Sequence, residues 1–171
     1  MKKILVVTCV LVVMGVVTLP VLAIPPDHET IPAGPPVTYP VCYKEGVYDF
    51  AVRNVPTGFY EITTFYDRGG NPDRINFFWN IHWEISIEGT DTVIAKSIQA
   101  GPEWVTIVDG EMVTDIVMGA IDTTHIIGQG PLSFNVGRLV FDSDWNLVFE
   151  AGNHSQITEE EICDAFASFA P

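Results

Sequence analysis

The segment INFFWNIHWEISI, residues 75–87, decides the fold class because it alternates strictly between two kinds of side chain. Its odd-numbered positions are large and apolar throughout: Ile75, Phe77, Trp79, Ile81, Trp83, Ile85 and Ile87. The positions between them are polar, with the single exception of Phe78. Successive side chains of a β-strand point to opposite faces, so this period of two predicts one long strand with one buried face.

Turn signals on both sides of this segment divide the chain into further strands. Asp109-Gly110 lies between residues 105–108 and 112–114, both apolar in character, which is the pattern of a two-residue β-hairpin. Further turns rich in glycine, asparagine or aspartate are expected at residues 68–72, 88–91, 128–131 and 142–146. No helical crossover fits between these segments, so we expect about seven to nine antiparallel strands joined by hairpins.

The expected architecture is therefore all-β. An antiparallel sheet of this size must protect its edges, either by closing into a barrel or by forming two packed sheets. Because the strands follow one another in sequence order, we favour an up-and-down, lipocalin-like β-barrel. A β-sandwich is the alternative.

One α-helix is expected near the C-terminus. Thr158 is a suitable N-cap, and Glu161 three residues later completes a capping box. Ile162, Cys163 and Phe166 then share one helical face, which we expect to pack on the sheet.

The chain before the sheet divides into two segments. Residues 1–23 have the three parts of a secretory signal peptide: Lys2 and Lys3, an apolar stretch, and a small residue at Ala23. Residues 24–40 contain six prolines, and we expect them to form an extended arm without regular structure. Residues 41–171 are expected to form a single β domain that includes the C-terminal helix.

Two cysteines are left once the signal peptide, with Cys9, is removed. An even pair in an exported chain predicts a disulfide between Cys42 and Cys163, and two separate buried thiols are the alternative. The expected location is therefore extracytoplasmic, either periplasmic or extracellular. No membrane span is expected after cleavage.

The charge balance restricts the kinds of molecule that the protein can bind. Lys and Arg number 8 against 22 Asp and Glu, which gives a formal net charge of −14. An acidic surface repels phosphate groups, which excludes nucleic acid and docking on anionic lipid through a basic patch. A hydrophobic fraction of 47% excludes a disordered acidic tail.

Aromatic side chains suggest a ligand cavity. Phe77, Trp79 and Trp83 share one strand face, and Phe134 is expected to join them from another strand. A barrel of about eight strands can hold one small ligand, so these residues are candidates for binding an apolar or amphipathic molecule. The alternative is that they only fill a packed core.

A second group of residues could carry acid–base chemistry or a metal. His82 and Glu84 share a strand face, and His125 lies with Asp122 on another strand. They form a site only if the two strands are neighbours. Polar residues on the solvated face of an amphipathic strand are the alternative.

Asp142, Asp144 and Asn146 have the ligand spacing that begins a calcium loop. Leu147 stands where the loop requires glycine, and Asn153 where it requires an acidic residue. A hairpin turn explains the same residues without a metal. Because the chain also has no nucleophile motif and no phosphate-binding glycine loop, we expect no cofactor.

The segment GRLVFDSDWNLVFEAGNH, residues 137–154, resembles a signature of small secreted bacterial proteins, G-R-x-V-F-D-x-D-x-N-x-V-F-E-A-G-x-H, whose family is uncharacterised. The resemblance extends to residues 65–74 and to one early and one late cysteine. Trp145 stands where that family usually has glycine, so we expect Asn146 to adopt the left-handed conformation instead. The resemblance implies a fold and export, and it brings no catalytic residues.

Three functions follow as expectations. The first is a secreted barrel that binds a small apolar or amphipathic ligand. The second is a cyclase- or isomerase-type enzyme in which an acid such as Glu84 assists. The third is a non-catalytic extracellular interaction module held on the proline-rich arm. The oligomeric state is left open.

Overall fold

The computed structural model describes residues 23–39, 42–44, 47–155 and 157–170. The signal peptide expected over residues 1–23 lies outside these ranges except for Ala23. Within them the elements are β1 (Asp27–Pro32), β2 (Val37–Tyr39), β3 (Tyr43–Lys44), β4 (Tyr48–Asp49), β5 (Val52–Tyr66), β6 (Pro72–Ile87), β7 (Val93–Val108), β8 (Glu111–Ile126), β9 (Gly130–Asp142), β10 (Leu147–His154) and α2 (Glu159–Ala167).

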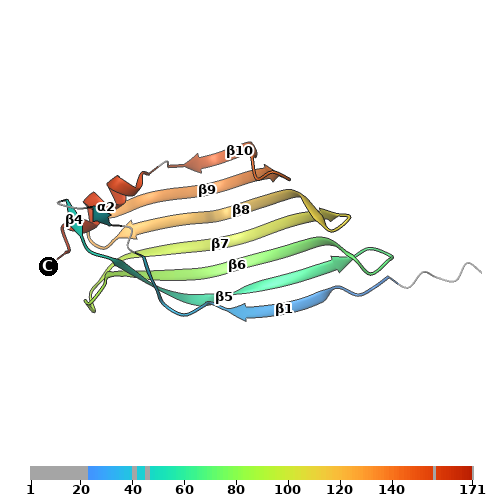
Figure 1. The fold of residues 1–171 in the computed structure, drawn as a ribbon, viewed down its shortest axis with the longest axis horizontal. Helices are drawn as coiled ribbons and strands as arrows, with labels where there is room; N and C mark the ends of the chain where they lie inside the picture. Colours follow the sequence, from blue (N-terminus) through green and yellow to red (C-terminus); the bar gives the residue numbers. More distant parts are fainter. Residues whose placement is uncertain (1–22, 40–41, 45–46, 156, 171) are drawn as a thin grey trace, which may run out of the picture.

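The fold is all-β with one C-terminal helix, as predicted (Figure 1). Eight strands form one antiparallel sheet in the order β1-β5-β6-β7-β8-β9-β10, with β2 also paired to β5. The strands from β5 to β10 follow one another up and down in sequence order. Strands β3 and β4 form a separate two-stranded sheet.

The large sheet is open. Its path ends at β1 and β2 on one side and at β10 on the other, and no pairing between these edges occurs in the described part of the chain. Closure into a barrel is therefore not confirmed. The β-sandwich is not found either, because the second sheet has only two short strands.

The alternating segment is the central strand β6, as its period of two predicts. Its odd-numbered side chains share one face, and Ile81, Ile85 and Ile87 on that face are buried. Towards the other end of the strand, Trp79 and Phe77 are only partly buried. The prediction of one buried face along the whole strand therefore holds only for the half from Ile81 to Ile87.

The predicted hairpin turn between β7 and β8 is confirmed. Asp109 and Gly110 both have positive φ, at 54° and 83°. Positive φ at both central residues matches the right-handed twist of the flanking strands, which is why Asp-Gly is favoured there.

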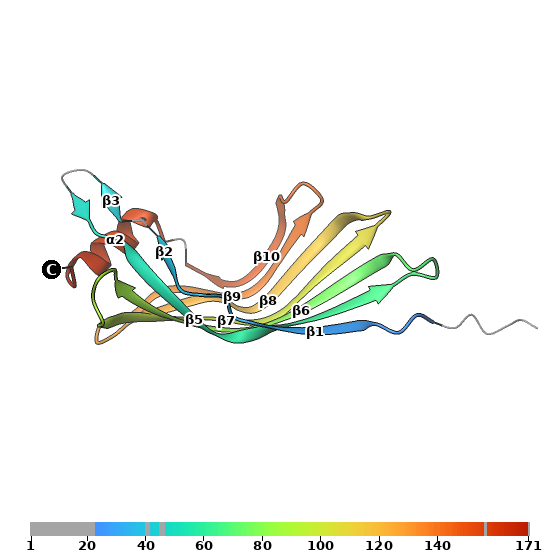
Figure 2. The ribbon, with the colours of Figure 1, turned by 60° about the horizontal axis from the view of Figure 1, so that its bottom comes forward.

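The sheet bends across its middle, so that both of its ends rise on the side where α2 lies (Figure 2). We call the α2 side the concave face and the other side the convex face. Five glycines with positive φ lie in the interiors of β5 and β7 to β10, and those on neighbouring strands face one another: Gly58, Gly101, Gly119, Gly137 and Gly152. A Cβ at Gly58 would lie 1.9 Å from the carbonyl oxygen of Asn80, and one at Gly137 would lie 2.2 Å from that of Ala151. Only glycine permits this backbone approach between neighbouring strands.

Helix α2 covers one end of the concave face. The predicted capping box is present, since the Thr158 hydroxyl accepts from the Glu161 N–H and the Glu161 carboxylate accepts from the Thr158 N–H. Cys163 and Phe166 point into the main buried cluster, whose other members are Cys42, Tyr48, Val52, Ile85, Ile87, Ile94, Ala95 and Ile126. The sequence pattern thus gave the correct buried face of the helix.

Two side-chain links hold this helix to the start of the domain. A disulfide joins Cys42 to Cys163, across 121 residues of chain, as predicted. Tyr48 on β4 also donates a hydrogen bond to the Asp164 carboxylate, which raises the pKa of Tyr48 to about 12. The disulfide fits an oxidising, extracytoplasmic environment.

The proline-rich segment is not an arm without regular structure, and this expectation is wrong. Strand β1 pairs with β5 from Asp27 to Pro32, and β2 pairs with the same edge of β5 from Val37 to Tyr39. An edge strand tolerates proline because half of the strand's backbone N–H groups point away from the sheet. A proline at such a position removes no hydrogen bond from the sheet. Pro35 and Pro36 lie in the connection between the two strands.

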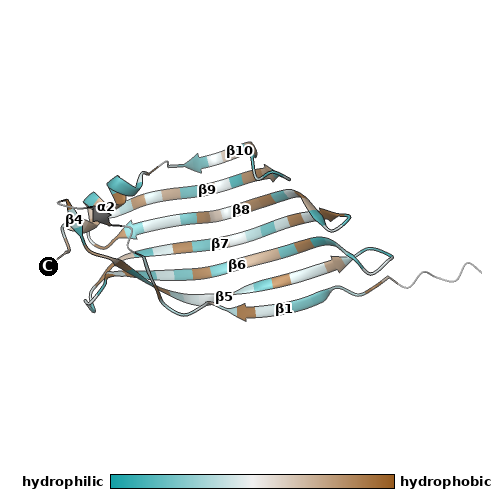
Figure 3. Cartoon of the chain, in the orientation of Figure 1, coloured by the Kyte–Doolittle hydropathy of each residue, from teal (hydrophilic) through white to brown (hydrophobic). Residues whose placement is uncertain are grey.

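Hydrophobic residues continue along β6 to β9 beyond the part of the sheet that α2 covers (Figure 3). In that half the sheet is a single layer. Within the described ranges, no helix combines the length and apolar character that a membrane crossing requires.

We expect Gly58→Ala to lower the free energy of unfolding by at least about 2 kcal/mol, because the new methyl group collides with backbone and the φ of 106° is strained for alanine. Urea unfolding measures this change. The control is Gly34→Ala, where a Cβ meets nothing within 4 Å, and its effect should stay within about 0.5 kcal/mol. Equal stability of the two variants would show that the bend does not depend on this contact.

We expect the double variant Cys42→Ala, Cys163→Ala to lose about 2–5 kcal/mol of stability, because the cross-link limits the freedom of the unfolded chain. Denaturant midpoints of the oxidised protein and the variant give the difference. Reduction of the wild-type protein should produce the same change. A midpoint that stays the same in both experiments would contradict the anchoring role of this bond.

Candidate functional site

The uncovered half of the concave face carries a cluster of aromatic rings. Trp79 on β6 pairs directly with Tyr60 on β5, and their rings meet edge to face with centroids 5.0 Å apart at 80°. Phe77, the next residue on the same face, has its ring centroid 6.3 Å from that of Trp79. Edge-to-face contacts stabilise such pairs beyond simple burial, so the cluster is a preformed apolar wall.

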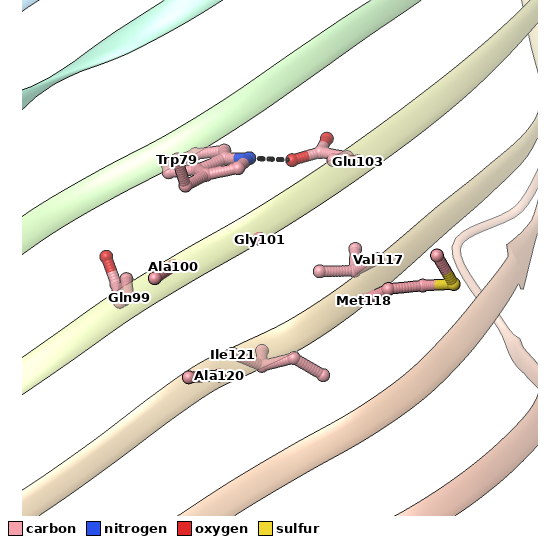
Figure 4. A pocket seen from close by; sticks show the side chains of 9 residues that line it. All are labelled: Trp79, Gln99, Ala100, Gly101, Glu103, Val117, Met118, Ala120 and Ile121. Atoms are coloured by element: carbon pink, nitrogen blue, oxygen red, sulfur yellow. Dashed lines mark hydrogen bonds between the residues drawn. The ribbon is translucent and has the colours of Figure 1, made fainter.

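A hollow of about 150 Å³ lies beside Trp79, and residues of β7 and β8 form most of its lining (Figure 4). We call it the Trp79 hollow. It is lined by Trp79, Gln99, Ala100, Gly101, Glu103, Val117, Met118, Ala120 and Ile121. Most of this lining is apolar, and Glu103 supplies its one charged group. A mainly apolar surface with few polar groups is typical of small-molecule sites.

Glu103 is held in place by the tryptophan. The Trp79 Nε1–H donates to Glu103 Oε2 at 2.7 Å, and Figure 4 shows the two side chains pointing toward each other. Burial raises the pKa of Glu103, and the nearby charge of Asp115 raises it further, while the hydrogen bond from Trp79 opposes both effects. The Glu103 carboxyl group therefore binds a proton more readily than an exposed glutamate does.

Asp115 lies on β8, on the same concave face as Glu103. Strand register pairs Glu103 with Val117 and Val105 with Asp115, so the two acids are diagonal neighbours. Asp115 is 3% exposed, and burial raises its pKa although the Ile116 N–H partly stabilises its charge. Its Oδ1 is buried and has no hydrogen-bond partner among the described residues. An unpaired buried carboxylate oxygen is costly, so this position favours a proton or a cation.

A second hollow of about 260 Å³ lies between α2 and the covered end of the concave face. Apolar side chains from both elements line it, among them Ile85 and Phe166. Its polar groups include Asn54 and Asp122, and Asp122 accepts hydrogen bonds from the hydroxyls of Ser97 and Thr124. The concave face thus carries polar groups in both hollows.

The structure brings three of the four predicted ligand residues onto one face. Phe77 and Trp79 stand side by side, and Trp83 follows on the same strand, where its Nε1–H donates to Gln99 Oε1 at 3.3 Å. Phe134 does not join them. It pairs with Thr123, and this register places it on the convex face, where it is 39% exposed.

The predicted acid–base group lies on the convex face. Lys96 pairs with Glu84 on one side and with His125 on the other, so the two predicted residues are separated by a lysine. Lys96 Nζ and Glu84 Oε1 form an exposed ion pair at 2.9 Å. His82 and His125 are also exposed, while Asp122 lies on the opposite, concave face. These residues therefore form a solvated surface rather than a converging site.

The predicted calcium residues form a turn. Asp142 Oδ1 accepts hydrogen bonds from the backbone N–H groups of Asp144 and Asn146, both at 2.9 Å, and from the Asn146 side chain. These bonds lower the pKa of Asp142, with the contribution of Asn146 the largest. Asp67 and Asn71 form the same arrangement between β5 and β6.

The conformation expected for Asn146 is wrong: the positive φ, 61°, belongs to Trp145. Gly70 has the corresponding position and a φ of 86° in the equivalent turn. Over the residues that the structure describes, no group of three or more His, Cys, Asp or Glu side chains is arranged to hold a metal.

Sequence reasoning missed Glu103 and Asp115. A signal was present, because Asp115 lies between Val113 and Val117 on one face of the expected strand, in an otherwise apolar stretch. An acid on an apolar strand face is unusual enough to mark a candidate site. Its pairing with Glu103 depends on the alignment of two long strands, which the sequence pattern alone does not provide.

Comparison with known proteins adds no family: no family model, no curated protein and no solved structure matches this chain. The resemblance of residues 137–154 to secreted bacterial proteins stays a prediction.

We expect Asp115→Asn to raise the free energy of unfolding at neutral pH, because the folded protein disfavours the charged form of Asp115. Between the ordinary pKa of 3.8 and the higher pKa of the folded state, the folded chain binds more protons than the unfolded chain. The contribution of Asp115 to stability therefore falls as the pH rises through this window.

Urea unfolding at several pH values from about 4 to 8 tests this dependence. The advantage of Asp115→Asn should be largest at the upper end of the range and shrink toward the lower end. Asp91→Asn, in an exposed turn, is the matched control and should show no such trend. An advantage that is independent of pH would contradict the prediction.

Proposed function

We propose that this protein is a non-catalytic binding protein for a small amphipathic molecule, which it holds on the uncovered half of its concave face. The observation that carries the proposal is the Trp79 hollow, in which the Trp79 ring and aliphatic side chains meet the carboxylate of Glu103, with Tyr60 and Phe77 beside Trp79 on the same face. An apolar body would pack against Trp79, Tyr60 and Phe77. A polar group would face Glu103.

The partly buried rings of Trp79 and Phe77 support this proposal, because they leave aromatic surface accessible beside the hollow. On the helix side of the bend the same face is covered by α2, whereas Trp79 and Phe77 lie beyond that cover. The proposal does not require a closed barrel, because a trough can bury one side of a ligand and leave the other in contact with solvent.

Export, which the disulfide supports, fits a protein that captures a molecule outside the cytoplasm. The interaction module held out on a proline-rich arm is less well supported, because the described part of that segment is paired along β5.

An enzyme is the second candidate, and Glu103 and Asp115 favour it. Two neighbouring carboxyl groups with raised pKa values hold a proton more readily than exposed carboxyl groups do, and a general acid of an isomerase or cyclase must hold one. Glu103 would then take the role that the sequence suggested for Glu84, which instead pairs with Lys96 on the convex face. Loss of turnover in Glu103→Gln, with ligand binding retained, would select this candidate.

Binding is tested with Trp145→Phe as the background, since Trp145 is 66% exposed in a turn and contributes fluorescence unrelated to the site. A panel of medium-chain alcohols, terpenoid alcohols and alkylamines is titrated while tryptophan emission is recorded. We expect saturable binding, weakened at least about tenfold by Trp79→Leu because the main apolar contact is removed.

Phe78→Leu is the matched control. Phe78 is the next residue on β6, lies on the convex face and is 44% exposed. Its replacement should leave affinity unchanged. A panel without any saturable ligand, or equal losses in both variants, would contradict binding on the concave face.

A further inference from the structure

We propose that the second hollow, of about 260 Å³ between α2 and the covered end of the concave face, binds a compact neutral molecule that joins an apolar ring to one hydroxyl group. We call it the α2 hollow. This site is separate from the Trp79 hollow and would give the protein a second ligand. Its size, its fixed wall and the polar groups that line it carry the proposal.

The α2 hollow is larger than the voids that close packing leaves inside a protein. Such voids rarely exceed the size of one water molecule. This hollow measures about 260 Å³, although Val52, Ile85 and Phe166 of the main buried cluster line it. Since an apolar cavity of about 150 Å³ is enough to hold benzene, the α2 hollow has room for a benzene ring with a branched substituent.

The helix that forms one wall of the hollow is held in place. The disulfide of Cys163 and the hydrogen bond from Tyr48 to Asp164 tie α2 to the start of the domain. Phe166 packs into the main buried cluster, whereas Ile162, one turn earlier, is partly buried and lines the hollow. The wall is therefore formed before a ligand arrives, so binding does not have to order it.

The sheet supplies polar groups to the same hollow. Asp122 is partly exposed, and the hydroxyls of Ser97 and Thr124 both donate to its Oδ1. No described residue donates to its Oδ2, which can therefore accept a hydrogen bond from a ligand.

Ser133 adds a second polar group. It lines the hollow, is 4% exposed, and its hydroxyl has no hydrogen-bond partner among the described residues. It pairs with Thr124, which makes it a diagonal neighbour of Asp122 on the concave face. A mainly apolar hollow with a few neighbouring polar groups is typical of small-molecule sites.

The charges around the hollow favour a neutral ligand. The basic residues of the large sheet lie on its convex face: Arg53, Arg74, Lys96 and Arg138. An anionic ligand would therefore meet Asp122 without a balancing cation. An ammonium group would lose its hydration among isoleucine, leucine, valine and phenylalanine side chains, which costs much more free energy than the desolvation of a hydroxyl group.

A hydroxyl group matches both polar side chains. It can donate to the Asp122 Oδ2, and a hydrogen bond to an ionised acceptor is about twice as strong as one between neutral groups. Its oxygen can accept from the Ser133 hydroxyl at the same time. The ring would then pack against Ile85, Leu132 and Ile162. The ligand class that fits this lining is therefore an apolar ring with one alcohol group.

The test uses four probes built on the same isopropylbenzene ring: cuminyl alcohol, p-cymene, cuminylamine and cuminate. They carry a hydroxymethyl, methyl, aminomethyl or carboxylate group at the same ring position. Each is titrated into the full protein at neutral pH while methyl NMR resonances are followed. Ile157, Ile162 and Leu132 report on the α2 hollow, and Val117 and Ile121 report on the Trp79 hollow.

We expect cuminyl alcohol to shift the α2 reporters saturably and to bind there at least about tenfold more tightly than p-cymene. Cuminylamine and cuminate should bind the α2 hollow more weakly than the alcohol. An alcohol that binds there no better than p-cymene or the amine would overturn the ligand class. If no probe shifts the α2 reporters, the hollow holds only solvent and the second site is overturned. Shifts confined to Val117 and Ile121 would do the same while supporting the proposed function, so the two proposals fail separately.

Ile162→Trp is designed to fill the hollow with a larger side chain. It should weaken cuminyl alcohol binding at least about tenfold, read from the Leu132 resonances. Ile98→Trp is the matched control, because Ile98 lies on the convex face and is 37% exposed, and it should leave the affinity unchanged. Unchanged affinity in Ile162→Trp would place the probe outside the α2 hollow and overturn the site.

Asp122→Asn tests the hydrogen bond without a change of shape, since the amide oxygen can still accept from Ser97 and Thr124. The preference for cuminyl alcohol over p-cymene should fall at least about threefold, with p-cymene affinity within about twofold of the wild-type value. Glu84→Gln removes an exposed carboxylate from the convex face and should keep the preference. A preference that survives in Asp122→Asn would overturn the assigned acceptor.

Discussion

The structure depends on the close approach of neighbouring backbones at five glycines in the interiors of β5 and β7 to β10. At Gly58 and Gly137 a side chain would coincide with a carbonyl group of the next strand. Because the glycines of β7 to β10 face one another on neighbouring strands, these strands bend together rather than twist independently. The bend turns a broad sheet into a trough with one concave face (Figure 2).

The bend also divides that face into two parts with different roles. On one side α2 packs against β5 to β8 and forms the buried cluster, and the disulfide from Cys163 to Cys42 fixes the helix in place. On the other side nothing among the described elements covers the sheet, and long strands alone support Trp79 and its neighbours. Stability is concentrated at the covered end, so the open end can carry groups that a packed core would not tolerate.

Sequence patterns predicted the features that depend on neighbours along the chain. The period of two in β6, the Asp109-Gly110 turn and the Thr158–Glu161 capping box all formed as expected. Barrel closure depends on the summed twist and bend of all strands, so the sequence of a single segment does not predict it. Trp145 rather than Asn146 takes positive φ because both the backbone and side chain of Asn146 must reach Asp142. Likewise, Phe134 and Trp79 lie on opposite faces of the sheet, and only the register of the strands between them shows this.

Asp115 is the residue that stability alone does not explain. A valine or leucine at this position would continue the apolar face and would remove the one unpaired buried oxygen that Asp115 contributes. The sheet has four basic residues that could have supplied a counter-ion, yet each of them lies on the convex face. Burial raises the pKa of Asp115, and buried acids with raised pKa values occur often at functional sites. The proposed binding role of the open end of the trough would explain why an acid with an unpaired oxygen is kept there.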